Sequence, residues 1–132
     1  MTLRKQTIAL FAVLLFSLNA LGGMRQTSTQ GYELYSWKVK GHWRYSLLPG
    51  TKRSRSYEEI TAPGVVRRDA DALKTELRKL PKGEQVFWMS DAPAGASKSA
   101  AGQLLNVKHP SRTRIKSIKA MCDRLGIKLK LS

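Results

Sequence analysis

The stretch that decides the fold is Tyr32–Thr51, YELYSWKVKGHWRYSLLPGT. It holds five of the eight aromatic residues that follow the N-terminal apolar segment. Aromatic runs bounded by glycine and proline are typical of β-strands. The stretch therefore predicts a β-hairpin, and its second strand should end at Pro49-Gly50 because proline donates no ladder hydrogen bond.

Two loop lengths are open for this hairpin. A two-residue loop at Lys40-Gly41 places Trp37 opposite Arg44 and Trp43 opposite Lys38. A three-residue loop at 39–41 instead pairs the two tryptophans and puts Gly41 in the left-handed position of a bulged turn. We favour the three-residue loop because a register slip would spoil a whole apolar face. That face would carry Tyr35, Trp37, Trp43, Tyr45 and Leu47, and the other would carry Ser36, Lys38, His42, Arg44 and Ser46.

The rest of the chain alternates helical and extended patterns. A Ser56-x-x-Glu59 capping box predicts a short helical turn, and Asp69 and Ser111 are placed to cap two longer helices. Apolar or alternating runs predict strands at 85–89 and 127–131. The order β-β-α-β-α-β predicts an α/β fold, a two-layer sandwich in which two main helices cover one face of a four-stranded mixed sheet.

The N-terminal segment predicts the cellular location. Arg4 and Lys5 precede the apolar run 8–18, and small residues follow it, so residues 1–22 fit a secretory signal peptide. An uncleaved membrane anchor is the alternative. We expect a flexible lead at 23–31, a single domain at 32–132, and a mobile loop at 90–107, where small residues and turn formers predominate. The protein is therefore expected to be exported, to a periplasmic or extracellular location.

The formal net charge of +15 favours attraction to polyanions. Nucleic acid, an acidic envelope polymer and anionic lipid headgroups all remain open as partners, as does a protein partner. If the aromatic face is buried, the opposite face is open and presents a basic surface, and its alternative is a merely solvated face. The predicted binding residues are Lys38, His42, Arg44, Lys128 and Lys130.

A second basic group surrounds the predicted helix starts, with a solvated loop as its alternative. It consists of Lys52, Arg53 and Arg55, joined by Arg67 and Arg68.

Catalytic chemistry has little support in the sequence. His42 and His109 are the only histidines, and a Ser90/His109/Asp91 arrangement would lack any motif. The single cysteine, Cys122, lies on the apolar stripe of the last helix, which favours a structural thiol. We expect neither a metal nor a cofactor, since no zinc-ligand spacing exists and 92–99 lacks both glycines of a P-loop.

The phrases Tyr32–Trp37 and Trp43–Thr51, with Val86–Trp88 and the Gly126-Ile127 end, resemble those of small exported bacterial proteins of unassigned function. The resemblance covers most of the chain after the leader. It implies an exported α/β domain and transfers no catalytic residue.

The sequence thus predicts a non-catalytic binding module that uses a basic sheet face for an anionic polymer or partner. One alternative is a small exported hydrolase, nuclease-like, that uses His42 or His109. The other is a protein–protein inhibitor or accessory subunit, whose sign would be a large exposed apolar patch.

Overall fold

The computed structural model describes residues 30–51 and 55–132. The predicted signal peptide or anchor at 1–22, nearly all of the lead, and Lys52 and Arg53 lie outside these residues. The described strands are β1 (Tyr32–Val39), β2 (His42–Pro49), β3 (Val66–Arg67), β4 (Gln85–Trp88) and β5 (Lys128–Leu131). The helices are α3 (Tyr57–Ile60), α4 (Ala70–Arg78) and α5 (Arg112–Leu125).

The predicted helix starts are confirmed by their caps. Ser56 and Glu59 form a complete capping box on α3. The Asp69 side chain accepts a hydrogen bond from the backbone of Ala72, and Ser111 caps α5 in the same way. Gly126 ends α5 with a φ of 75°, a left-handed conformation that glycine adopts without steric cost.

The hairpin has the two-residue loop, so the favoured three-residue loop is wrong. Val39 pairs with His42, Trp37 with Arg44 and Lys38 with Trp43. Lys40 and Gly41 have φ values of 50° and 82°, which identifies a type I′ turn, and the backbone twist of this turn matches that of the strands it joins. The two tryptophans therefore lie on opposite faces of the sheet.

The sheet is mixed and has the strand order β3-β2-β1-β4-β5. Strands β1, β4 and β5 are parallel, whereas β2 is antiparallel to both β1 and β3. The predicted α/β class is confirmed, but the sheet has five strands rather than four. The extra strand, β3, has only two residues and is therefore too short to show an alternating pattern in the sequence.

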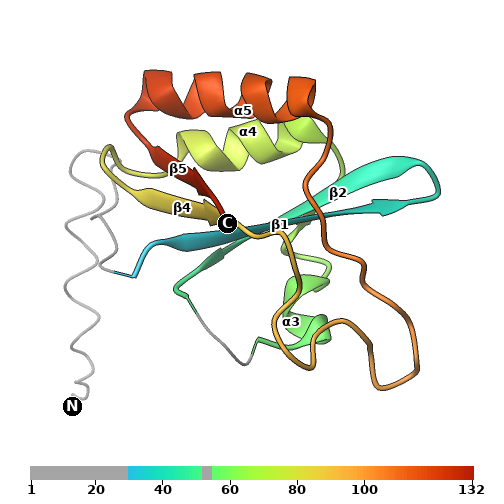
Figure 1. The fold of residues 1–132 in the computed structure, drawn as a ribbon. Coiled ribbons are helices and arrows are strands. Elements are labelled where there is room, and N and C mark those ends of the chain that lie inside the picture. Colours follow the sequence, from blue (N-terminus) through green and yellow to red (C-terminus); the bar gives the residue numbers. More distant parts are fainter. Residues whose placement is uncertain (1–29, 52–54) are drawn as a thin grey trace, which may run out of the picture.

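Both main helices cover one face, as expected (Figure 1). The buried leucines of α4, Leu73 and Leu77, pack on side chains that point from the sheet toward the two helices. The apolar stripe of α5 packs on the same side chains. This first core contains Leu34, Tyr45, Leu73, Leu77, Leu80, Val86, Trp88, Ile118, Met121, Cys122, Ile127 and Leu129.

Part of the opposite face, at β1 and β2, is covered as well, whereas the sequence predicted this face to be open. Helix α3 and the long segment between β4 and α5 lie beneath the sheet (Figure 1). They form a second core of Tyr35, Trp37, Leu48, Ile60, Ala96, Leu105 and Val107. The mobility predicted for 90–107 stays a prediction, but three buried side chains fix this loop to the sheet.

Across the described residues, no helix combines the length and apolarity needed to span a membrane.

Candidate functional site

The five predicted binding residues are not brought together on one face. Lys128 and Lys130 alternate with buried Leu129 on β5, so they point to the side opposite the main helices. His42 and Arg44 point to that side too, but from β2, and β1 and β4 lie between the two pairs. Lys38 is on the helix side. Three of the five predicted binding residues therefore lie on the hairpin, and the other two lie on the edge strand β5.

The three hairpin residues gain a cation that sequence reasoning missed. Lys108 contacts Trp43, with its Nζ atom 5.8 Å from the ring centroid, and Lys38 Nζ lies at the same distance from that ring. Trp43 is half-buried against the first core. We call Lys38, Lys40, His42, Trp43, Arg44 and Lys108 the hairpin end.

Ser36 positions Lys108. The backbone N–H of Lys108 donates to the carbonyl of Ser36 over 2.9 Å, and the Ser36 hydroxyl donates to the carbonyl of Lys108 over 2.6 Å. The same hydroxyl accepts a hydrogen bond from the buried indole of Trp88. Nothing in the sequence links these residues, because 72 positions separate Ser36 from Lys108.

The hairpin end has an excess of positive charge that the described residues do not neutralise. The four ion pairs found among them join Arg55 to Glu33, Arg67 and Lys79 to Glu76, and Lys119 to Asp123. None uses Lys38, Lys40, Arg44 or Lys108. Arg44 donates instead to the backbone carbonyl of Arg68.

A further cation lies beside the hairpin. Arg114, in the first turn of α5, donates from Nη1 to the hydroxyl of Tyr45 over 3.0 Å. Burial raises the pKa of Tyr45, while the neighbouring guanidinium acts in the opposite sense. The phenol therefore stays neutral and leaves the charge of Arg114 uncompensated.

The second basic group is not a surface anion site at Arg55. Its side chain is 3% exposed, and its Nε atom lies 3.0 Å from Glu33 Oε1. Its Nη2 atom donates to the carbonyls of Pro49 and Gly50. Arg55 thus points inward and fixes the end of β2, whereas Arg67 pairs with Glu76 on α4.

Among the described contacts, His109 binds a backbone carbonyl and an indole ring rather than Ser90 or Asp91. His109 Nε2 lies 3.0 Å from the carbonyl oxygen of Trp88, and the ring packs edge-on against that indole. A carbonyl only accepts, so Nε2 carries the proton and donates to it. His42 is exposed on the hairpin.

Cys122 is a structural thiol, as its position predicts. It is fully buried in the first core. Burial, followed by the nearby Asp123 carboxylate, raises its pKa to about 11. Within the described ranges, no three His, Cys, Asp or Glu side chains are grouped in a way that suits a metal ion.

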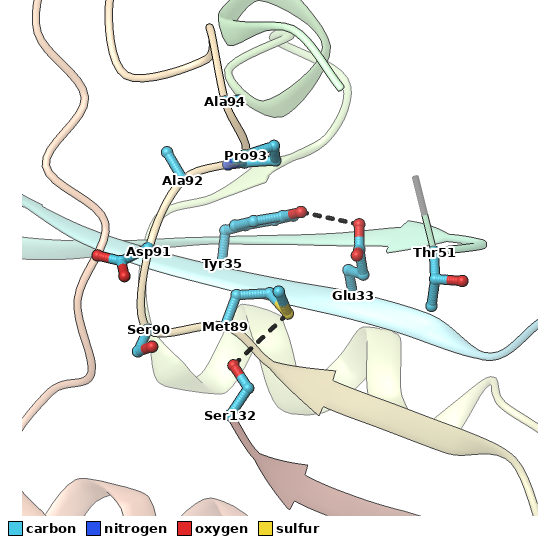
Figure 2. A pocket seen from close by; sticks show the side chains of 10 residues that line it. All are labelled: Glu33, Tyr35, Thr51, Met89, Ser90, Asp91, Ala92, Pro93, Ala94 and Ser132. Carbon is cyan, nitrogen blue, oxygen red and sulfur yellow. Dashed lines mark hydrogen bonds between the residues drawn. The ribbon is translucent and has the colours of Figure 1, made fainter. Parts of the chain in front are cut away.

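A cavity of about 540 Å³ lies beneath the sheet where β4 and β5 end (Figure 2). On the wall of the cavity that β1 forms, which we call its floor, the Tyr35 hydroxyl donates to Glu33 Oε1 over 2.8 Å. Burial and this hydrogen bond raise the pKa of Tyr35. Asp91 and Ser90, which the sequence offered only as a triad arrangement without a motif, line this cavity.

Comparison with protein-family models, with curated proteins and with solved structures finds no match to this chain. Its function is therefore argued from its own residues.

Proposed function

We propose that the protein is a non-catalytic binding module that holds an anionic polymer at the hairpin end. The observation that supports this proposal is the approach of Lys38 and Lys108 to one indole ring without a paired carboxylate. Two ammonium groups near one ring concentrate positive charge at this end of the hairpin, and that charge attracts a polyanion. Polyanions bind such a surface by counterion release.

The geometry favours contact through charge rather than through stacking of bases. Trp43 is half-buried, and Lys38 and Lys108 already lie near its ring. A nucleotide base would have to displace them to stack. We therefore expect binding with little sequence preference, to sulfated and phosphorylated polymers alike.

The alternatives have less support. A hydrolase would need a histidine beside a nucleophile or an acid, but His109 Nε2 binds the Trp88 carbonyl, and Ser90 and Asp91 line the cavity beneath the sheet. An inhibitor would need a broad apolar patch, whereas the large exposed apolar residues of the described chain, Val39, Leu104 and Leu131, lie on three separate segments. Export, which rests on residues 1–22, stays a prediction from the sequence.

Two double variants test the proposal in the full chain. Lys38→Gln with Lys108→Gln removes two charges from the hairpin end, and Lys128→Gln with Lys130→Gln removes two from β5. Affinity for fluorescent oligothymidylate and for heparin is measured between 50 and 300 mM NaCl. The hairpin pair should weaken binding, and should make the salt dependence on the oligonucleotide shallower by about 1.4 in log–log slope, or 0.7 per lost contact.

The β5 pair is the matched control and should change affinity only slightly. Equal losses in both variants would mean that net charge alone drives binding. A larger loss in the β5 pair would place the polymer on the edge strand and contradict the proposed site.

A further inference from the structure

The cavity beneath the sheet is chemically unlike the rest of the surface. The chain carries a net charge of +15, yet the described residues that line the cavity include Glu33 and Asp91 and no lysine, arginine or histidine. Its volume falls within the range of small-molecule sites. The described lining thus offers an anionic ligand no cationic side chain.

The floor offers a hydrogen-bond acceptor. The Glu33 side chain is 7% exposed, and the bonds it receives from Tyr35 and Arg55 both end on Oε1. A carboxylate has two oxygens, each able to accept more than one hydrogen bond. Oε2 therefore keeps acceptor capacity on a side chain that lines the cavity.

The counterion of Glu33 does not supply a competing donor to the cavity. Arg55 donates to Glu33 through Nε and to the backbone of β2's end through Nη2, and it is not among the lining residues. A ligand must thus bring its own donor. The walls accept an apolar body, because they are formed by Met89, Ala92, Pro93 and the ring of Tyr35 (Figure 2).

We infer that this cavity binds a small apolar amine, with its ammonium group donating to Glu33 and its hydrocarbon body packed against Met89 and Pro93. A charged donor to a buried carboxylate forms the stronger class of hydrogen bond. Asp91 adds negative potential at the mouth, although its carboxylate points away from Glu33 (Figure 2). This site is separate from the hairpin end and independent of the polymer.

The test compares three probes of similar shape on the full chain labelled with ¹³C-methyl methionine. The probes are 2-phenylethylammonium, neutral 2-phenylethanol and anionic 3-phenylpropionate, at 150 mM NaCl and pH 7. The Met89 methyl signal, assigned with Met89→Leu, reports the cavity. Met121, buried in the core on the other face of the sheet, is the internal reference.

We expect the ammonium to shift Met89 but not Met121, and to bind at least about tenfold more tightly than the alcohol. The carboxylate should bind more weakly than either. Equal affinities for the three probes, a preference for the carboxylate, or no shift of Met89 at 10 mM ammonium would each overturn the inference.

Variants then locate the site without removing Glu33, whose loss would leave Arg55 buried and unpaired. Ala94→Phe adds bulk at an exposed lining residue and should weaken ammonium binding several-fold, whereas Ala100→Phe, on the same loop outside the cavity, should not. Asp91→Asn should keep the preference for ammonium over alcohol. If Asp91→Asn abolishes that preference, the assignment to Glu33 is wrong.

Discussion

Arg55 is a charged side chain that the fold keeps inside. Its guanidinium binds Glu33 and also the backbone carbonyls of Pro49 and Gly50, where β2 ends. The side chains of Arg55 and Glu33 are both more than nine-tenths buried. Removing one member of such a pair leaves the other charge desolvated without compensation. Together with Tyr35, these residues tie β1 to the segment after β2.

Changing Arg55 to Met should lower the free energy of unfolding by about 3–5 kcal/mol. The matched control is Arg67→Met, which breaks a partly exposed ion pair with Glu76 and should cost less than about 1 kcal/mol. Urea denaturation of both variants measures the difference. Similar losses in the two would show that burial of the Arg55 pair has no energetic consequence.

The buried thiol of Cys122 predicts a pH dependence. Its pKa is about 11 in the folded chain against 9.0 for an ordinary thiol, so the unfolded state loses this proton first as the pH rises. The associated stability is fully present below pH 9 and is lost between pH 9 and 11. Two pKa units correspond to about 2–3 kcal/mol.

We expect the stability difference between the native chain and Cys122→Ala to shrink by that amount over this window. The difference matters because burial also raises the pKa values of Tyr35 and Tyr45, which both chains share. Urea titrations at pH 8 and pH 11 give the result. A constant difference would contradict the assignment of the shift to Cys122.

At the scale of elements, the hairpin shows why a pattern of aromatic residues did not determine the register. The apolar-face argument requires one buried and one open face, and here both faces are buried, so Trp37 and Trp43 enter different cores. The turn sets the register, because Gly41 takes one of the two positive-φ positions of a type I′ loop and Lys40 takes the other.

The turn makes a backbone prediction. An added Cβ at Gly41 meets no atom within 4 Å, but its φ of 82° is unfavourable for an L-residue. Gly41→Ala should therefore destabilise the chain by about 1–2 kcal/mol. Gly64→Ala has equal space without a positive φ, and its effect should be neutral or slightly stabilising. Equal effects, measured by urea denaturation, would exclude the left-handed turn.

For the whole molecule, the central point is that one sheet carries two cores. Helices were predictable because caps and apolar stripes are local signals, as Asp69 and Ser111 show. The cover beneath the sheet was not, because the loop that forms it has no period and reaches its partners over long sequence separations. For the same reason Lys108 at the hairpin end and Glu33 beside Arg55 had no signal in the sequence, although Lys38, His42 and Arg44 were found.

Two adjacent leucines test whether the second core stabilises the whole fold. Leu105 is 4% exposed and Leu104 is 77% exposed. Leu105→Ala should cost about 2–5 kcal/mol, and Leu104→Ala should change stability by less than about 0.5 kcal/mol. Far-UV circular dichroism follows the helices on the opposite face, and tryptophan fluorescence follows the sheet.

Both probes should show the same shift of the unfolding midpoint in Leu105→Ala, because the two cores share the sheet. If the helical signal kept its midpoint while the fluorescence midpoint fell, the two faces would be separate cooperative units.

The strand order has a consequence for how the chain is assembled during synthesis. β1, the first described strand to leave the ribosome, lies at the centre of the sheet, and every later strand joins an edge that already exists. β2 and β3 extend the sheet on one side, and β4 and β5 then extend it on the other. No strand has to insert between two that are already paired, so a nascent chain can add each element in the order of its translation.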